Sequence, residues 1–312
     1  MLWYLPYPSW IHPEIIPGLP MRWYGLMYVV AFAITYLLFR WQVAHDDVGA
    51  YSKDEVDDLF FKAILLLLVG ARLVSQLVYD SSVYNWTHPW MAFWPFRGGR
   101  FTGLAGMSYH GGLIGAILGG LWFSRSRHKD FLETCDIACA GIPLGYTFGR
   151  LGNFLNGELW GRVSTVPWAM VFPDARRFST SEGWVRGVME KVGMEQAGTL
   201  VNLPRHPSQL YEALFEGVLL FLFLWFVIRP RKRNHQSGFV LGWYLVGYGF
   251  VRFLVEYCRT PDENLGYVLC RGSGADNIQL FGSFLNISLG QIFCLLMMLA
   301  GAILLFVRSR RT

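Results

Sequence analysis

Seven long apolar stretches limit what this chain can fold into. Each is close to the roughly 20 residues that an α-helix needs to cross the hydrocarbon core of a bilayer. Because hydrocarbon satisfies no backbone N–H or C=O group, each stretch is predicted to be helical. The predicted spans are residues 23–41, 59–78, 107–123, 136–154, 210–228, 239–258 and 289–307.

The composition also indicates a membrane protein. Charged residues make up 16% of the 312 positions and hydrophobic residues 53%, whereas an ordinary soluble domain has about 25% charged residues. We therefore expect an all-α integral membrane protein with one polytopic domain over residues 1–312. A soluble two-domain enzyme, a disordered chain and a small disulfide scaffold are excluded. The first residues lack a basic segment followed by a short apolar run, so no signal peptide is expected.

Basic residues in the short connections predict the orientation of the spans. Clusters of Lys and Arg follow the third, fifth and seventh spans, at residues 125–129, 229–233 and 308–311. An odd number of spans places all three clusters on one side, which the positive-inside rule assigns to the cytoplasm. The N-terminus then faces outward, and so does the long loop 155–207, which is expected to form a small cap. The net charge of +5 is explained by basic residues that control the topology and contact anionic lipid headgroups. No nucleic-acid partner is therefore expected.

Cofactor motifs are absent from the sequence. The five cysteines form no CxxC pair and no zinc spacing, and HExxH, P-loop and GxGxxG patterns do not occur. We therefore expect no cofactor and no metal ligand. Cys258 and Cys270 both fall on the outward side, where a disulfide between them is one open alternative.

Two kinds of residue stand out within the spans. Gly111, Gly115 and Gly119 repeat at four-residue spacing, which predicts close helix packing. Ionisable residues also occur there, although a charge at membrane depth costs about 2.5–3.5 kcal/mol. They are Arg72, His110, Arg150, Glu212, Glu216, Arg252 and Glu256.

Arg150 and Arg252 are predicted to lie at the same outward depth. Structural ion pairs are the main explanation for Arg72 and Glu216. Two arginines at one level, with His110 and Asn153 beside them, are better explained as a receptor for a lipid phosphate. A guanidinium binds phosphate through two parallel hydrogen bonds and remains charged.

Residues 149–162 read GRLGNFLNGELWGR and resemble the signature of the prolipoprotein diacylglyceryl transferase family. Further matches keep the family's order along the chain. They are WYGLMY at 23–28, MSYHGG at 107–112, RHPSQLYE at 205–212, YGFVRF at 248–253, then Glu256, Arg259, Pro261, Asp262 and Gly290-Gln291. Tyr109 stands where Phe is common, and the stretch 265–288 is longer than usual.

The resemblance implies a bacterial inner-membrane enzyme with seven spans, a periplasmic N-terminus and a cytoplasmic C-terminus. Such an enzyme moves the sn-1,2-diacylglyceryl group of phosphatidylglycerol to the lipobox cysteine thiol of a preprolipoprotein signal peptide. A thioether forms and glycerol phosphate leaves. The residues that the resemblance carries over are Tyr24, His110, Arg150, Asn153, Asn156, Glu158, Gly161, Tyr248, Arg252 and Glu256.

The chemistry assigns a role to several of these residues. His110 is expected to take the thiol proton, since an unperturbed histidine has a pKa near 6.5; anchoring the helix start is its alternative role. Arg150 and Arg252 would stabilise the charge on the departing phosphate. The two asparagines would hold ester or glycerol oxygens, and Glu158 and Glu256 would orient the arginines. An arginine acting as the base remains open.

A secondary transporter for an anionic solute is the main alternative function. Buried arginines and glycine-rich helices suit it equally well. Transporters often contain an internal repeat, but the two halves of this chain show no convincing similarity. A membrane scaffold without activity is a third interpretation, which leaves the outward arginines unexplained.

Overall fold

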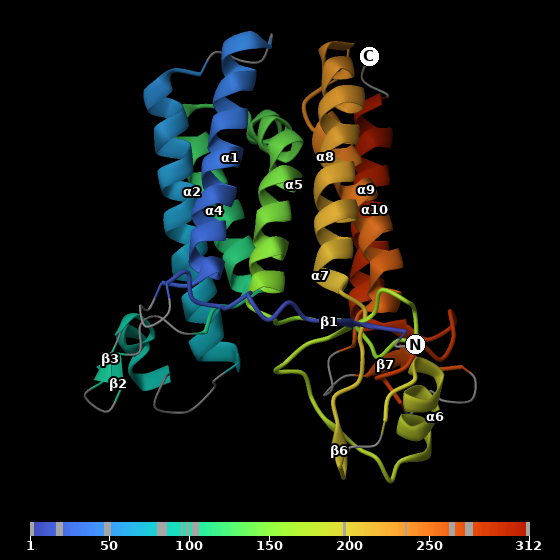
Figure 1. The fold of residues 1–312 in the computed structure, drawn as a ribbon. Coiled ribbons are helices and arrows are strands. Elements are labelled where there is room, and N and C mark those ends of the chain that lie inside the picture. Colours follow the sequence, from blue (N-terminus) through green and yellow to red (C-terminus); the bar gives the residue numbers. More distant parts are fainter. Residues whose placement is uncertain are drawn as a thin grey trace. The chain divides into compact units, whose positions relative to one another are not determined.

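The computed structural model describes residues 3–16, 21–46, 51–79, 86–94, 96–97, 100–101, 106–195, 198–234, 236–261, 266–271 and 277–309. Most of these residues are helical, and the strands are two or three residues long (Figure 1). The expected helical class is thereby confirmed. Asp262, Arg310 and Arg311, which the sequence analysis singled out, lie outside the described residues, as does part of the stretch 265–288.

Helices occupy all seven predicted ranges. The first four are α1 (Trp23–His45), α2 (Lys53–Val74) with η1 (Ser75–Tyr79), α4 (Tyr109–Arg127) and α5 (Phe131–Leu155). The fifth range is covered by four consecutive helical elements, α7 (Ser208–Tyr211), η3 (Glu212–Leu219), α8 (Leu220–Leu222) and η4 (Phe223–Ile228). The last two are α9 (Phe239–Val255) with η6 (Glu256–Cys258), and α10 (Leu289–Ser309). Shorter helices are η2 (Pro89–Phe93), α6 (Gly183–Val192) and η5 (Arg229–Asn234).

Among the described residues, five helical segments are long and apolar enough to cross a membrane. They are Trp23–His45, Lys53–Tyr79, Ser208–Arg231, Phe239–Cys258 and Leu289–Arg308. The helices α4 and α5 also form where spans were predicted, but glycines and polar residues make them less apolar. The count of seven spans therefore stays a prediction.

Four pairs of short strands join loop segments. β1 (Leu5–Pro6) pairs in parallel with β4 (Met170–Val171). The antiparallel pairs are β2 (Phe96–Arg97) with β3 (Arg100–Phe101), β5 (Phe178–Ser179) with β6 (Leu200–Val201), and β7 (Tyr267–Leu269) with β8 (Ile287–Ser288).

The chain divides into two compact units, and we describe each by itself. One comprises residues 38–137, and the other comprises residues 1–37 and 138–312. In the unit of residues 38–137, α2 and α4 pack closely through glycines. A Cβ atom on Gly119 would lie 2.6 Å from the carbonyl oxygen of Lys62, and one on Gly115 would overlap the backbone of Leu66. Only residues without a side chain allow this approach, in agreement with the predicted packing.

Gly115→Ala is expected to destabilise the protein by about 1–3 kcal/mol, because the new methyl group has no room against α2. Gly112→Ala is the matched control on the same helix. There the added Cβ would lie 3.6 Å from its nearest neighbours, an ordinary contact. Thermal unfolding in detergent checks the difference, and equal melting temperatures for the two variants would contradict it.

Arg72 has a structural position in the same unit. It is buried in α2 and donates hydrogen bonds to the carbonyl oxygens of Ala92 and Gly106, the latter at 2.7 Å. The side chain therefore ties the loop after η1 to the helix.

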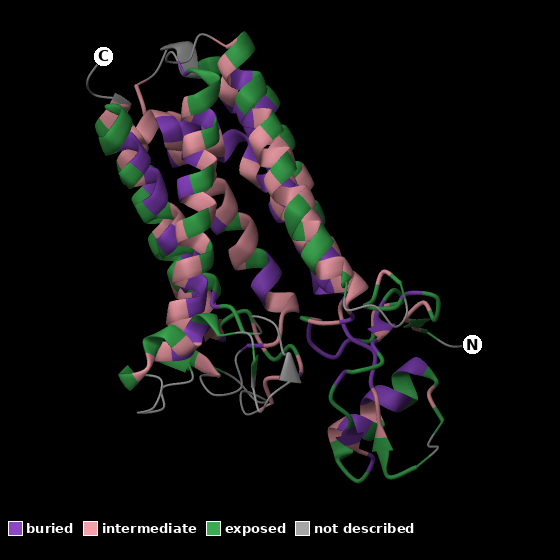
Figure 2. Ribbon diagram, turned by 90° about the vertical axis from the view of Figure 1, so that its left-hand side faces the viewer, coloured by how far each residue is buried: buried purple, intermediate pink, exposed green. Residues whose placement is uncertain are grey.

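Glycines also bring helices together in the unit of residues 1–37 and 138–312. A Cβ on Gly145 of α5 would lie 2.7 Å from the carbonyl oxygen of Ala31 in α1. One on Gly301 of α10 would lie 2.7 Å from the carbonyl oxygen of Gly242 in α9. Large apolar side chains such as Phe293 remain exposed along the helices, and Figure 2 shows exposed residues over much of the helical length. Such a surface suits lipid.

The predicted cap, residues 155–207, contains an apolar core around α6. The buried core residues are Val163, Phe178, Val185, Val188, Met189 and Leu203. Arg205, 1% exposed, connects this stretch to Gln279. Its Nη1 atom donates to the carbonyl oxygen of Gly161 (3.3 Å) and to Oε1 of Gln279 (3.1 Å).

The segment that follows α9 is joined to the cap through Arg162. Its backbone N–H donates to the carbonyl oxygen of Cys258 (2.9 Å), and its Nε donates to the carbonyl oxygen of Arg259 (2.5 Å). Cys258 and Cys270 are free thiols in the structure. The disulfide that the sequence left open is therefore not formed there.

Candidate active site

The last turns of α5 place Tyr146, Arg150 and Asn153 on one face of the helix. Nε of Arg150 donates to the hydroxyl oxygen of Tyr146 (2.7 Å) and lies 2.8 Å from Oε2 of Glu212. Its Nη1 donates to Oδ1 of Asn153 (3.4 Å). Within the described part of the chain no hydrogen bond of Nη2 of Arg150 is found, so this nitrogen keeps its hydrogens for a ligand.

Arg252 lies on α9 and meets Arg150 at the same carboxylate oxygen. Its Nη1 is 3.1 Å from Oε2 of Glu212 and 3.5 Å from Oε1 of Glu216. Its Nη2 is 3.0 Å from Oε2 of Glu256, which lies four residues further along the chain. The two arginines that the sequence placed at one depth are thus held together by one carboxylate.

A third guanidinium joins this group. Arg259 follows η6, and its Nη1 lies 2.5 Å from Oε1 of Glu212 while its Nε lies 3.6 Å from Oε2 of Glu256. Sequence reasoning missed Arg259 and Glu212 as site residues. The available signal was charge balance, because two arginines in apolar helices need buried carboxylates as partners.

The charged side chains of this cluster differ in exposure. Those of Glu212 and Glu216 are 0% exposed, and that of Glu256 is 9% exposed. The side chains of Arg150, Arg252 and Arg259 keep 16%, 17% and 20% exposure. The arginines are therefore the more accessible charges of the cluster, and a guanidinium is a group that binds anions through two parallel hydrogen bonds.

Asn153, Asn156 and Glu158 form a second polar group beside Arg150. Glu158 was expected to orient an arginine, but its Oε1 accepts hydrogen bonds from Nδ2 of Asn153 (3.0 Å) and Nδ2 of Asn156 (3.4 Å). A carboxylate only accepts, so both amide nitrogens must face it and both amide oxygens must point elsewhere. Oδ1 of Asn156 is buried and has no hydrogen-bond partner among the described residues. It is available to a donor such as a hydroxyl group.

Gly161 has a backbone role. Its N–H donates to the carbonyl oxygen of His206 (2.9 Å), and it forms a β-bridge with Arg259. A Cβ atom at this position would lie 2.9 Å from Cβ of His206 and would overlap the carbonyl oxygen of Cys258. Glycine is required because three backbone segments meet here, one of which leads directly into Arg259.

Two aromatic residues carried over from the family also lie in this unit. The hydroxyl of Tyr24 is 2.9 Å from that of Tyr28 on α1, and the backbone of Tyr24 approaches α5 at Gly152. The ring of Tyr248 on α9 packs edge-on against Tyr146, with the ring centroids 6.0 Å apart. Tyr248 therefore contacts a partner of Arg150.

A model of the prolipoprotein diacylglyceryl transferase family matches residues 12–307. The chain belongs to this family. A relative from Treponema denticola, named phosphatidylglycerol–prolipoprotein diacylglyceryl transferase, is 51% identical over 96% of this chain and 93% of its own length. Relatives of the same name from Treponema pallidum and Chlorobaculum tepidum are 48% and 40% identical, over 95% and 99% of this chain and 92% and 94% of their own.

Of the residues that the family resemblance carried over, His110 lies in the unit of residues 38–137. It follows the N-cap residue Ser108 of α4, whose side chain accepts from the backbone N–H of Gly111. Nδ1 of His110 lies 3.2 Å from the hydroxyl of Tyr79. The ring is exposed, and the hydrogen bond to Tyr79 restrains its orientation.

A second histidine of the family motifs, His206, lies in the same unit as the arginines. The indole N–H of Trp168 donates to the hydroxyl of Tyr211 (2.6 Å), so the Tyr211 hydrogen is free to face Nδ1 of His206 (3.1 Å). Burial and the nearby Arg162 lower the pKa of His206 to about 4. His206 is therefore uncharged near neutral pH and adds no positive charge to the arginine cluster.

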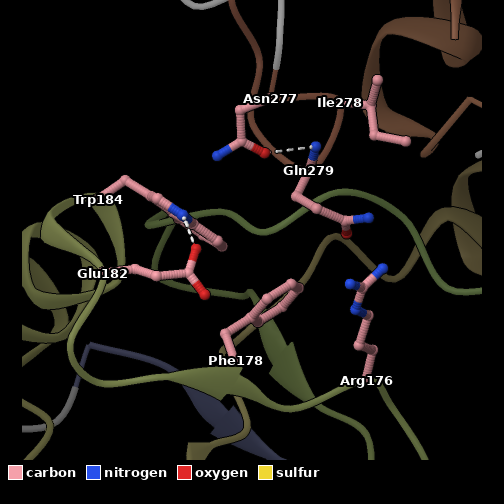
Figure 3. Close-up of a pocket in the computed structure, with 7 residues that line it drawn as sticks. All are labelled: Arg176, Phe178, Glu182, Trp184, Asn277, Ile278 and Gln279. Atoms are coloured by element: carbon pink, nitrogen blue, oxygen red, sulfur yellow. Dashed lines mark hydrogen bonds between the residues drawn. The ribbon is translucent and has the colours of Figure 1, made fainter.

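The cap of this transferase contains a hollow of about 510 Å³, shown in Figure 3. Its described lining is Arg176, Phe178, Glu182, Trp184, Asn277, Ile278 and Gln279. The indole N–H of Trp184 donates to Oε2 of Glu182 (2.6 Å), and the backbone N–H of Gln279 donates to Oδ1 of Asn277 (3.0 Å). This lining contains none of the residues carried over from the family, so the hollow is separate from the arginine cluster.

Gly161→Ala is expected to lower the transferase activity about tenfold or more, because the new methyl group pushes apart the segments that position Arg259. Gly183→Ala is the control, since a Cβ there meets nothing within 4 Å. Initial rates and melting temperatures of both variants decide the question. Equal rates for the two variants would show that the close approach at Gly161 does not matter.

Proposed function

We propose that the arginine cluster binds the phosphodiester of phosphatidylglycerol and that the chain transfers the diacylglyceryl group to the lipobox cysteine of a preprolipoprotein. The thiolate sulfur attacks the glycerol carbon that bears the phosphate. The carbon–oxygen bond breaks, its electron pair leaves with the phosphate oxygen, and a thioether forms. Glycerol phosphate is the second product, and no electron acceptor or donor is needed.

The observation that carries this proposal is the cluster of three partly exposed arginine side chains that pair with buried carboxylates. Negative charge develops on the departing phosphate, and preorganised cations stabilise it most where water is scarce. The open Nη2 of Arg150 gives this charge a direct hydrogen-bond donor. The relatives' names favour a transferase over the transporter considered as the alternative.

The asparagines are proposed to hold the headgroup. Glu158 turns the amide nitrogens of Asn153 and Asn156 toward itself, which leaves their oxygens as acceptors. Ester oxygens cannot donate a hydrogen bond, whereas the headgroup glycerol carries hydroxyl groups that can. We therefore favour the glycerol hydroxyls over the ester oxygens as the group that Asn156 binds. Tyr24, Tyr248 and Glu256 complete the surroundings, and Gly161 keeps the backbone that supports Arg259 in place.

His110 is proposed as the base that accepts the thiol proton. A cysteine thiol, with a pKa near 8.5, reacts as its thiolate. For Nε2 of His110 to accept that proton, the ring must carry its own hydrogen on Nδ1 and donate it to the hydroxyl of Tyr79. The distance of 3.2 Å between those atoms allows this hydrogen bond.

We further propose seven membrane spans in the bacterial inner membrane, with the N-terminus and the cap in the periplasm. The basic clusters at residues 125–129, 229–233 and 308–311 support this orientation. Both substrates then reach the site through the membrane, and the prolipoprotein delivers its cysteine at the outer leaflet.

The test uses the purified chain in detergent with phosphatidylglycerol and a synthetic lipobox peptide. Mass spectrometry is expected to show one diacylglyceryl group on the peptide, together with released glycerol phosphate. A peptide with serine in place of the cysteine is the control and should remain unmodified. A lack of adduct on the cysteine peptide, or solute flux through liposomes without any adduct, would refute the proposed function.

A further inference from the structure

Glu212 is the point at which three arginines from different parts of the fold meet. Its Oε2 is 2.8 Å from Nε of Arg150 and 3.1 Å from Nη1 of Arg252. Its Oε1 is 2.5 Å from Nη1 of Arg259. Since its side chain is 0% exposed, solvent does not reach this carboxylate. The guanidiniums, with the Tyr146 hydroxyl at 3.2 Å from Oε2, provide its hydrogen bonds.

We propose that Glu212 is the positioning residue of the phosphate site. It holds the guanidiniums of Arg150, Arg252 and Arg259 at the spacing that the departing phosphate requires, and it does not itself touch the lipid. The inference rests on the proposed function and deepens it, because it assigns the arrangement of the cationic surface to one buried carboxylate.

Electrostatics explains why the arrangement depends on this residue. Arginine cannot relieve repulsion by losing its proton. A neutral side chain at this position would leave Glu216 and Glu256 as the described ion-pair partners of Arg252 and Arg259. Arg150 would lose its ion pair, and the guanidiniums would move apart, since breaking a buried ion pair leaves its partner charges uncompensated. A shift of about 1 Å in a positioning group lowers a rate by about 100-fold in unfavourable cases.

Glu216 is a matched comparison within the same helix. It lies four residues further along η3 and is also 0% exposed, but among the described residues it forms an ion pair with one arginine, Arg252 at 3.5 Å. Its other contact is a hydrogen bond from the hydroxyl of Tyr146 (2.6 Å). The two glutamates thus share residue type, helix and burial, and they differ in how many guanidiniums they hold.

The first experiment compares the kinetics of Glu212→Gln, Glu216→Gln and the unaltered protein in the peptide assay. For Glu212→Gln we expect kcat to fall by more than about tenfold, while KM for phosphatidylglycerol does not rise, because the cluster gains net positive charge. Glu216→Gln should lose less, and Glu212→Asp should recover part of the activity. A rise in KM at unchanged kcat, or equal losses in the two glutamine variants, would overturn the proposal.

The second experiment measures the arginines without reference to turnover. Phenylglyoxal modifies free guanidiniums, and peptide mass spectrometry gives the rate at each arginine. Glu212→Gln should accelerate modification at Arg150, Arg252 and Arg259, whereas Glu216→Gln should accelerate it at Arg252 alone. Unchanged rates at all three arginines in Glu212→Gln would refute the positioning role. If Glu212→Gln does not fold, Glu212→Asp takes its place, with acceleration expected for at least one of the three.

The two experiments separate this inference from the proposed function. An unaltered protein that forms no adduct speaks against the function, yet the modification rates still test whether Glu212 holds the arginines. An unaltered protein that forms the adduct, together with a fully active Glu212→Gln, speaks against the role of Glu212 alone.

Discussion

Arg252→Lys is expected to lower kcat/KM for diacylglyceryl transfer by about 100- to 1,000-fold, the effect of removing a donor that stabilises developing negative charge. Arg252 uses two nitrogens at once. Nη1 faces Glu212 and Glu216, and Nη2 faces Glu256. A lysine ammonium is a point charge that cannot span these positions. Peptide modification followed by mass spectrometry at several lipid concentrations measures the loss.

Arg186→Lys is the control for this prediction. Arg186 lies exposed on α6 in the cap, and an isolated surface substitution of this kind changes stability by at most about 0.5 kcal/mol. Its activity should equal that of the unaltered protein. A fully active Arg252→Lys would show that the site needs a positive charge and not the forked guanidinium.

His110→Gln is expected to lower kcat by about 100-fold or more, the usual contribution of a general base. Glutamine keeps a polar group of similar reach but cannot accept the thiol proton. The rate should recover partly when the reaction is run at higher pH, where the peptide thiol ionises without help. A pH series of initial rates measures this.

Tyr79→Phe provides the control for the tautomer of His110. It removes the hydroxyl 3.2 Å from Nδ1 and leaves the ring of His110 in place, so a smaller loss than that of His110→Gln is expected. If His110→Gln keeps activity within about threefold of the unaltered protein, His110 is not the base. The base would then have to be sought elsewhere, with an arginine as the alternative considered above.

The sequence was informative about helices and about which charges meet. Hydrocarbon satisfies no backbone hydrogen bond, so the apolar stretch 289–307 predicted a helix, and α10 spans Leu289–Ser309. The positions of Arg150 and Arg252 within their predicted spans put both at one level, and in the structure both lie close to Glu212. Glycine spacing predicted close helix contacts, and α2 and α4 make them.

The sequence did not reveal how each helix is rotated about its axis or how the chain turns after a helix. Packing between helices decides the direction in which Glu212 points from its helix. The hydrophobicity of a predicted span does not contain this information. The partners of Glu158 depend on the chain reversal after α5, where Gly157 and Leu159 adopt φ angles of 66° and 56°. The backbone role of Gly161 likewise arises only when residues 206 and 258 arrive beside it.

The proposed binding of phosphate by the arginine cluster has a consequence for turnover. The phosphodiester of the lipid substrate carries a single negative charge, but the monoester that departs carries about 1.5 to 2 at neutral pH. A surface formed by Arg150, Arg252 and Arg259 therefore attracts the leaving group more strongly than the lipid from which it came. The attraction that eases bond cleavage also slows the dissociation of glycerol phosphate. Product release is therefore a candidate for the slowest step of each cycle.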